Sequence, residues 1–586
     1  MVSTPDGQPN ITLDAVNFTT LPTFNAFLFV YASDFTMTRL RIIRVQNHAL
    51  RIMAGQIMYP PPSPPPEVRN IRIEDNVFDN SSLKDYPLGD GDAIRIWMEP
   101  EGIAADASIT NVQIVHNTFR HFQGKDAVTG TGVIIVPSGT NCVIRDVVIQ
   151  GNTFVDTMYP VEVGISQGSN NRVVGTRIFE NTFTNGLNPI FIGINVTQDR
   201  FASGSVIEDT VIRGNVFFGT LGSVEMVGGH TVGEATNATG NSIINTQIVN
   251  NLIVAGNGIH IIGGGPGGSG NRVDGVQVIN NTIITYPLAG VHADKNRGNG
   301  TENSVTGVSV LNTIIQNREP DKPRPEDVIA GEITPDQVRF SIISTPRFVG
   351  VNGNISADPK FVNPNYANPG EGDFHLQPGS PAIDAGTSDG APSTDLEGHA
   401  RFDDPSTPNT GEGAIRYYDI GAFEYGSHPA LYFPHVATNF PWQTEIAIIN
   451  TSDQTVTGTL RGLSDEGQLI ETKNVTLSAR GRRQITIADE FTNHTNIGYI
   501  IFDTSSVEVQ GYTKFYIAGS YRAAIPAVKE VNTSNIYIPH IASNADWWTG
   551  VSLVNTTSAP KVLTITFNNG QSRQITLTAN QHRAFD

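Results

Sequence analysis

The first 320 or so residues alternate short apolar segments with polar turns, and no stretch shows a helical period. Asparagines recur close to the ends of the apolar segments, at intervals of 29 to 41 residues. They are Asn17, Asn47, Asn76, Asn117, Asn152, Asn181, Asn215, Asn251, Asn281 and Asn312. A long repeat made of strands and turns is typical of a stacked solenoid, here a right-handed parallel β-helix.

A stack of inward-turning asparagines explains this repeat physically. Each side-chain amide offers two donors and an acceptor, so an amide can bond those of the coils above and below without water. Asparagine also tolerates the left-handed backbone conformation that a sharp corner needs. The Phe or Ile two residues later then enters the core. We therefore expect these asparagines to build the scaffold rather than to act in catalysis.

A second strand recurs in each coil, with a variable residue between apolar neighbours. The period of two along a strand buries the neighbours and turns the central residue outward. The outward residues form one column, Arg95, Ile134, Glu162, Phe191, Glu225, His260 and His292. Neighbouring coils lie about 4.8 Å apart, so adjacent members of this column can touch.

The pattern after residue 430 alternates apolar and polar positions and repeats at an offset of 105 residues. Tyr432-Phe-Pro-His435 matches Tyr537-Ile-Pro-His540, and Trp442 matches Trp547. A repeat of about 100 residues made of short strands predicts β-sandwiches of immunoglobulin-like size. Since the pairs keep one offset, we interpret them as structural rather than as sugar-binding platforms.

The fold class that follows is all-β, a single-stranded parallel β-helix followed by β-sandwich modules. We expect the β-helix in residues 1–345, a loop-rich extension in 346–428, a first sandwich repeat in 429–536 and a partial second repeat in 537–586. The first residues lack the basic and apolar regions of a signal peptide, and the second repeat stops midway. We therefore expect a piece of a longer chain, with association between copies as the alternative.

The extension carries two motifs, Ser380-Pro-Ala-Ile-Asp384-Ala-Gly386 and Asp419-Ile-Gly-Ala-Phe-Glu424. Over about 75 residues, this stretch closely resembles the bacterial choice-of-anchor Q proteins. The resemblance implies a secreted or surface-exposed bacterial protein, in which the element follows a pectate-lyase-like β-helix and precedes varied sorting signals. It implies no enzymatic activity, and no sorting signal is visible in this chain.

Composition narrows the function classes. The formal net charge is −19, which argues against a nucleic-acid partner because phosphate binding needs a basic face. No apolar run is long enough to span a membrane. The single cysteine, Cys142, is expected to be a small buried side chain, so there is no disulfide framework.

The outward column is the candidate site. Glu225, His260, His292 and Asp294 are the candidate catalytic residues, and Arg95, Glu162, Phe191 and Lys295 are candidate ligand-binding residues. Carboxylates and imidazoles supply general acids and bases, and cations neutralise uronates. An ordinary solvated face remains the preferred interpretation, because no complete lyase or polygalacturonase signature is visible. The two histidines with Glu225 form a less favoured metal set.

Acidic turns suggest calcium as an alternative ligand. Asp90, Asp92, Asp384, Asp395 and Asp419 lie in Gly-rich turns, and Ca²⁺ prefers oxygen ligands in such loops. The spacing matches no known calcium repeat, and aspartates in turns more often cap the backbone. We expect no obligatory cofactor.

These observations favour an extracellular or cell-surface bacterial protein of structural or adhesive function, in contact with polysaccharide or with neighbouring surface proteins. The alternative is a polysaccharide lyase or glycoside hydrolase that uses the outward column. The two differ in one observation, the release of unsaturated or reducing ends from a polysaccharide.

Overall fold

The computed structural model describes most of the chain, including nearly all of the β-helix. The described residues are 11–14, 25–43, 48–54, 67–81, 91–98, 105–122, 130–196, 200–231, 237–286, 288–317, 328–366, 370, 372–398, 401–404, 406–425, 430–452, 455–504, 509–519, 522–529, 538, 549–556, 561–567, 571–578 and 580–585. Asn17, Asn47, Asp90, His540 and Trp547 lie outside them.

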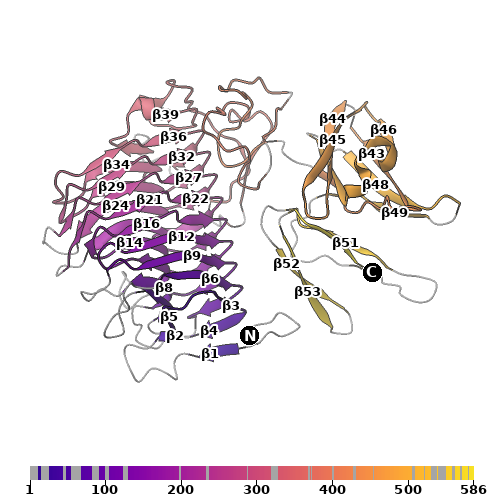
Figure 1. Cartoon of the computed structure of the whole chain (residues 1–586). Coiled ribbons are helices and arrows are strands. Elements are labelled where there is room, and N and C mark those ends of the chain that lie inside the picture. Colours follow the sequence, from indigo (N-terminus) through magenta and orange to yellow (C-terminus); the bar gives the residue numbers. More distant parts are fainter. Residues whose placement is uncertain are drawn as a thin grey trace. The chain divides into compact units, whose positions relative to one another are not determined.

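Three long parallel sheets stack as the sides of a β-helix (Figure 1), which confirms the predicted fold class. The ladder sheet contains β1 (Ile11–Asp14), β4 (Leu40–Ile43), β7 (Val77–Asp79), β10 (Thr118–Arg120), β13 (Thr153–Val155), β18 (Thr182–Thr184), β23 (Val216–Thr220), β28 (Leu252–Ala255), β33 (Thr282–Thr285) and β37 (Ile314–Asn317). The column sheet contains β2 (Asn25–Val30), β5 (His48–Ala54), β8 (Asp92–Met98), β11 (Thr131–Val136), β14 (Tyr159–Ile165), β19 (Ile190–Val196), β24 (Val224–Thr231), β29 (Ile259–Gly264), β34 (Val291–Asn296) and β38 (Ile329–Gly331).

The third sheet has more strands than the other two. It contains β3 (Phe35–Thr38), β6 (Val68–Glu74), β9 (Ser108–Val115), β12 (Val143–Gln150), β16 (Arg172–Val174), β17 (Arg177–Phe179), β21 (Val206–Glu208), β22 (Val211–Arg213), β26 (Ser242–Ile244), β27 (Gln247–Val249), β31 (Arg272–Asp274), β32 (Gln277–Ile279), β35 (Ser304–Thr306), β36 (Ser309–Leu311) and β39 (Val338–Arg339). A small fourth sheet joins β15 (Gly168–Ser169), β20 (Ala202–Ser203), β25 (Ala238–Thr239) and β30 (Gly268–Ser269).

The core of the β-helix contains a stack of phenylalanine rings from the ladder sheet. Consecutive rings of Phe78, Phe119, Phe154, Phe183 and Phe217 lie 4.6–5.1 Å apart between centroids. All five rings are fully buried, and Ile253 and Ile283 continue the same position in later coils. The prediction that the residue two after each ladder asparagine enters the core is therefore confirmed for these coils.

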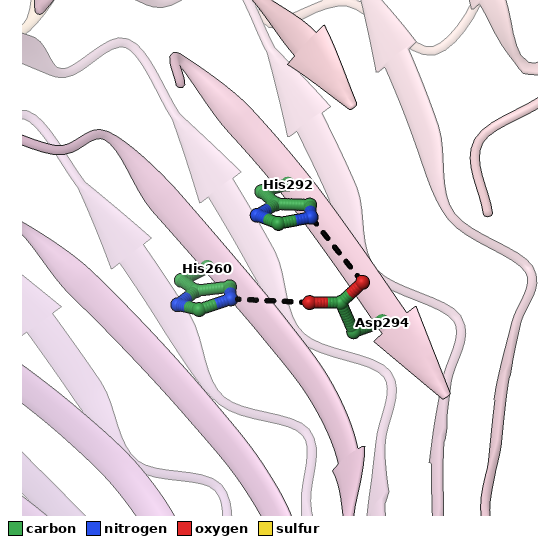
Figure 2. Close-up of side chains that lie close together, drawn as sticks. All are labelled: His260, His292 and Asp294. Atoms are coloured by element: carbon green, nitrogen blue, oxygen red, sulfur yellow. Dashed lines mark ion pairs between the residues drawn. The ribbon is translucent and has the colours of Figure 1, made fainter. Parts of the chain in front are cut away.

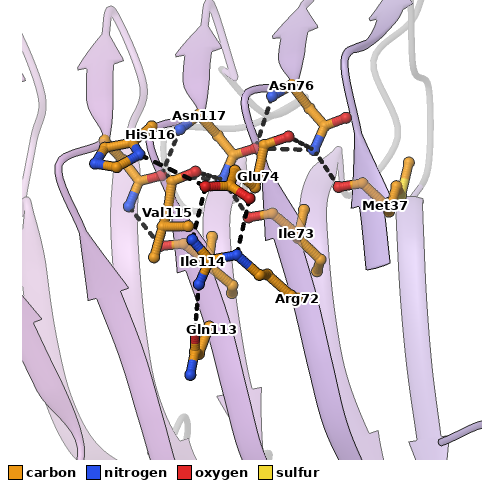
Figure 3. A network of polar contacts seen from close by, with 11 residues as sticks. Met37, Arg72, Ile73, Glu74, Asn76, Gln113, Ile114, Val115, His116 and Asn117 are labelled. Carbon is orange, nitrogen blue, oxygen red and sulfur yellow. Dashed lines mark hydrogen bonds and ion pairs between the residues drawn. The ribbon is translucent and has the colours of Figure 1, made fainter. Parts of the chain in front are cut away.

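The asparagine ladder forms as predicted from Asn76 to Asn281. In each step, Oδ1 of one asparagine accepts bonds from the backbone N–H and the Nδ2 of the asparagine in the preceding coil, at 2.8–3.1 Å. Figure 3 shows the step from Asn76 to Asn117 and the carbonyl of Met37 that accepts from Asn76 Nδ2. Since the ladder asparagines are buried, their amides satisfy one another without solvent.

The two ends of the ladder differ from the prediction. At one end, strand pairing places Leu40 in register with Asn76, and Leu40 N–H donates to Asn76 Oδ1. Asn47, predicted for this position, lies outside the described residues. At the other end, the hydroxyl of Thr313 replaces the predicted Asn312 as acceptor for Asn281 N–H. The spacing of asparagines was therefore a correct guide from Asn76 to Asn281 and a wrong one at Asn312, and the predictions for Asn17 and Asn47 stay untested.

The left-handed corner belongs to the residue before each ladder asparagine, not to that asparagine. Its φ is 56° at Asp75, 54° at His116, 56° at Glu180 and 51° at Asn250. The expectation that the asparagine itself adopts this conformation is therefore wrong from Asn76 to Asn281 and is confirmed only at Asn312, whose φ is 47°.

A second polar ladder, which the sequence pattern did not reveal, lies at the entry to the third sheet. Backbone N–H groups of successive coils donate to the side chains of Asn171, Ser205, Asn241, Asn271 and Asn303. Cys142 precedes Asn171 in this column and is fully buried, as predicted. The sequence does carry a signal for this second ladder, namely a Gly or Ser that recurs shortly before an Asn at the start of a strand.

The extension folds against the last coils and belongs to the same compact unit, which comprises residues 1–396 and 407–424. It contains the short helix η4 (Pro346–Phe348) and the strands β40 (Phe361–Asn363) and β41 (Asp373–Leu376), and the helix η3 (Pro335–Gln337) precedes it in the chain. Corner asparagines hold it, since Asn250 Nδ2 donates to the carbonyl of Thr394 and Asn280 Nδ2 to that of Asp419. Asn312 Nδ2 donates to the carbonyl of Thr387, which explains its departure from the ladder.

The second unit contains a sandwich of two antiparallel sheets. One sheet contains β42 (Ala430–Phe433), β44 (Val456–Leu463), β45 (Leu469–Leu477), β47 (Tyr499–Thr504) and β50 (Val528–Lys529). The other contains β43 (Gln443–Asn450), β46 (Arg482–Thr486), β48 (Val509–Tyr516) and β49 (Arg522–Pro526). The helices α1 (Ile487–Glu490) and η6 (His494–Asn496) lie between β46 and β47 in the chain.

The second sequence repeat pairs its strands as the first does. The strands are β51 (Val551–Val554), β52 (Lys561–Thr566), β53 (Ser572–Leu577) and β54 (His582–Phe585). Val554 pairs with His582 as Ile449 pairs with Arg482. Asn450 donates to a carbonyl in the turn after β45, and Asn555 donates to a carbonyl in the equivalent turn after β53. The two sequence copies therefore specify the same local topology.

Candidate functional site

The outward column exists in the register that the sequence predicted. Arg95, Ile134, Glu162, Phe191, Glu225, His260 and His292 pair one after another along the column sheet. Arg51 precedes Arg95 in the same register and was missed. Its context, Ala-Leu-Arg51-Ile-Met, has the same apolar neighbours and could have identified it.

His260, His292 and Asp294 converge at the end of the column. The imidazoles of His260 and His292 stack at 5.0 Å between centroids, with an interplanar angle of 9°. Figure 2 shows both Nε2 atoms turned toward Asp294, whose oxygens lie 3.7 Å from His260 Nε2 and 3.2 Å from His292 Nε2. Burial and the neighbouring charges of His292 and Arg297 lower the pKa of His260 to about 4, so its imidazole is neutral near pH 7.

Glu225 lies in the coil before His260 and is held from two directions. Asn188 Nδ2 donates to its Oε2 at 2.6 Å, and Arg297 Nη1 lies 3.2 Å from its Oε1. Burial raises the pKa of Glu225 above its ordinary value, although Arg297 acts in the opposite direction. Neither Asn188 nor Arg297 was predicted, because both reach the column from turns outside its repeating segments.

Glu162 and Phe191 occupy adjacent coils in the middle of the column. A Cβ added to Gly193 would meet the Phe191 ring, and one added to Gly164 would lie 3.2 Å from Glu162 Oε1. These glycines therefore let both side chains lie along the sheet surface. Burial and the negative charge of Asp92 raise the pKa of Glu162 to about 7, against the effect of Arg95.

The first coils add a compact charged cluster around Trp97. The guanidinium groups of Arg51 and Arg95 lie 4.0 Å and 4.7 Å from the Trp97 ring centroid. Arg95 Nη1 lies 3.5 Å from Asp92 Oδ2, and His48 Nδ1 lies 3.2 Å from the same oxygen. Cation–π contacts and these charge pairs hold Arg95 in place.

Three of the carboxylates proposed for calcium, those of Asp92, Asp395 and Asp419, contact the protein's own groups. Although burial opposes its ionisation, Arg95 and His48 hold the pKa of Asp92 below its ordinary value. Asp419 Oδ1 accepts from Asp384 N–H, and Asp395 Oδ2 accepts from Glu424 N–H. Of the aspartates in this set, Asp384, Asp395 and Asp419 are buried in the extension. Calcium binding by this set therefore stays a prediction, with backbone bonds as the observed role of Asp395 and Asp419.

Lys295, which was predicted as a ligand-binding cation, directly follows Asp294 in the chain. Its side chain is exposed and pairs with Glu332 at 2.9 Å.

Among the described residues, two groups of three side chains bring potential metal-ligand atoms within 4.8 Å of one another. They are His260, His292 and Asp294, and Glu74, Asp75 and His116. The structure thus brings together three of the four predicted catalytic residues and places Glu225 in the adjacent coil.

Comparison with known families and with curated proteins gives no match to this chain. In the described part of the chain, no helix has the length and apolar character needed to cross a membrane.

Proposed function

We propose that this is a secreted or cell-surface bacterial β-helix protein that binds an extracellular polysaccharide along the outward column. The observation that carries the proposal is the unbroken register of the column, which runs from Arg51 to His292 over eight successive strands. An extended, repeating ligand suits an extended, repeating surface.

The chemistry of the column supports this ligand class. Phe191 offers an aromatic face to the apolar side of a sugar ring, and the flanking carboxylates accept bonds from hydroxyls. Arg95 and Arg297 add cations at two separate places, which would favour a polymer that carries carboxylates. The side chains of Glu225 and Arg95 are only 17% and 22% exposed, so their positions are fixed before a ligand arrives.

The extracellular location rests on the motifs at Ser380–Gly386 and Asp419–Glu424. Their resemblance to choice-of-anchor Q proteins supports a surface role, structural or adhesive, in which the column contacts polysaccharide or a neighbouring surface protein. Antibody labelling of intact cells of the source bacterium tests this location, and labelling that requires permeabilised cells would contradict it.

Replacing Phe191 by alanine is expected to weaken polysaccharide binding by about 5- to 30-fold, or roughly 1–2 kcal/mol, because the column loses its central aromatic contact. Affinity electrophoresis or calorimetry against a panel of uronate and neutral polysaccharides measures this. Phe179→Ala is a matched control, since Phe179 is also half-buried on an outward face but lies on the third sheet, beneath Arg213 at 4.6 Å.

Equal loss of binding in both variants would indicate a general effect on the solenoid. No binding to any polysaccharide by the unaltered chain would reject the proposal.

A glycoside hydrolase is the second candidate, favoured by the raised pKa values of Glu162 and Glu225. Phe191 separates them by one coil, so their backbones lie about 9.6 Å apart. The carboxyl groups of inverting glycosidases lie about 6.5–9.5 Å apart, one acting as acid and the other as base. A carboxyl group that keeps its proton near pH 7 is suited to the acid role.

If Glu162 is this acid, hydrolysis should require its protonated form. With a pKa of about 7, activity should be present below that pH and fall as the pH rises through it. Reducing-end release measured from pH 5 to 9 checks this, and Glu162→Gln should abolish the release at every pH. An unchanged rate in Glu162→Gln and Glu225→Gln, or no release by the unaltered chain, would exclude this candidate.

A further inference from the structure

The group formed by His260, His292 and Asp294 has the composition of a transition-metal site. The two imidazoles come from neighbouring coils, and Asp294 lies two residues beyond His292 on the same strand, so β29 and β34 supply all three side chains. One potential ligand atom from each lies within 4.8 Å of the others. Figure 2 shows the side chains turned toward one shared space.

The polar atoms of this group are poorly satisfied by the protein alone. His260 Nε2 is buried and makes no hydrogen bond within the described residues, because Asp294 at 3.7 Å is too distant. The two oxygens of Asp294 are shared between two nitrogens, one of them at that long distance. An unbonded buried nitrogen is costly, and a ligand that accepts its lone pair would remove the cost.

Charge and donor type define the ligand. We propose that His260, His292 and Asp294 bind one divalent transition-metal ion, with Zn²⁺ as the best match. Two imidazole nitrogens and one carboxylate oxygen are a common zinc donor set, whereas Ca²⁺ requires six or more oxygens. Glu225 lies in the adjacent coil and brings a second carboxylate, and Arg297, which pairs with it, balances one negative charge.

The stacked rings can reach one ion with a small movement. Zinc–nitrogen bonds are about 2.0–2.1 Å, so two nitrogens on one ion lie at most about 4.2 Å apart. The rings therefore need to tilt toward each other from their nearly parallel positions. Three protein ligands leave at least one coordination position for water or for an oxygen of a bound molecule.

The other convergent group is a weaker candidate. It has one imidazole, His116, and its Glu74 is already bound by Arg72 at 2.6 Å and 2.8 Å. Metal binding there would require the loss of this ion pair. Of the two groups, the one formed by His260, His292 and Asp294 is therefore the better candidate for binding a metal ion.

Titration of the chelator-treated full chain with zinc chloride tests the proposal by calorimetry. One equivalent is expected to bind and to raise the melting temperature by mass action. His260→Gln and His292→Gln should each weaken binding by at least about 100-fold, the upper end of what an outer-shell loss costs. This expectation does not depend on polysaccharide binding, because the metal ion alone is the probe.

His121→Gln is a closely matched control. His121 Nε2 lies 3.2 Å from Asp156, and its side chain is 34% exposed, compared with 3.2 Å and 33% for His292. His121 belongs to neither of the two groups of potential metal ligands among the described residues, so its variant should bind zinc normally. Equal weakening in His121→Gln and His292→Gln would overturn the proposal, as would the absence of zinc binding.

If the histidine variants fail to fold, X-ray absorption at the zinc edge of the unaltered chain decides. Two imidazoles in the coordination shell are expected, and a shell of oxygens alone would overturn the assignment.

Discussion

Replacing Asn181 by leucine is expected to lower the free energy of unfolding by about 2–5 kcal/mol, since each buried polar group left without a partner costs about 1–3 kcal/mol. Asn181 Oδ1 accepts from both the backbone N–H and the Nδ2 of Asn152, and its own Nδ2 donates to the carbonyl of Ile149. Leucine would leave the buried N–H of Asn152 without this acceptor. Urea denaturation followed by circular dichroism measures the change.

Gln247→Leu is the control for this variant. Gln247 is an exposed amide on the outward face of the third sheet, so its replacement should change stability by no more than about 0.5 kcal/mol. An unchanged unfolding midpoint for Asn181→Leu would show that the ladder does not stabilise the solenoid.

Replacing Phe154 by alanine is expected to cost about 3–5 kcal/mol, because the fully buried ring leaves a cavity that close-packed neighbours cannot fill. Its centroid lies 4.6 Å from that of Phe119 and 5.1 Å from that of Phe183, so two aromatic contacts are lost with the ring. The same denaturation experiment measures this loss.

Phe179→Ala provides the comparison, because it removes the same side chain from an outward position of the third sheet. It should cost markedly less, since its ring is only half-buried and covered by Arg213. If the two variants were equally stable, the phenylalanine stack would not be a packed core.

The two variants test neighbouring coils of the β-helix. Asn181 belongs to the coil after Phe154, and the ladder and the stack both follow the ladder sheet. In a solenoid, each coil is stabilised mainly by the coils beside it. Loss of either contact should therefore destabilise a local set of coils first, and a broadened unfolding transition is the expected sign.

The middle of the β-helix could be predicted from the sequence because its cause is local. A buried amide and an aromatic ring must recur once per coil, and both leave a periodic trace in the chain. The ends of the asparagine ladder could not be predicted from the sequence, since the positions of Leu40 and Thr313 depend on which strands pair. In both places the prediction chose a nearby asparagine. At the later end this asparagine is Asn312, whose side chain binds the extension instead.

The candidate site shows the same division. The order of the outward column follows from apolar neighbours on each side of one variable residue, so its register was predictable. Arg297 and Asn188 reach Glu225 from turns. No spacing rule connects such residues, because loop paths set their positions.

The sequence by itself determined the all-β class, the stacked coils, the internal repeat after residue 430 and the order of the outward column. These follow from periodic burial, which every coil or repeat must satisfy separately. Only the tertiary structure decided that His260, His292 and Asp294 share one space and that burial and Asp92 raise the pKa of Glu162 to about 7. Side-chain convergence and pKa values depend on burial and on charges from distant coils, and neither leaves a periodic mark in the sequence.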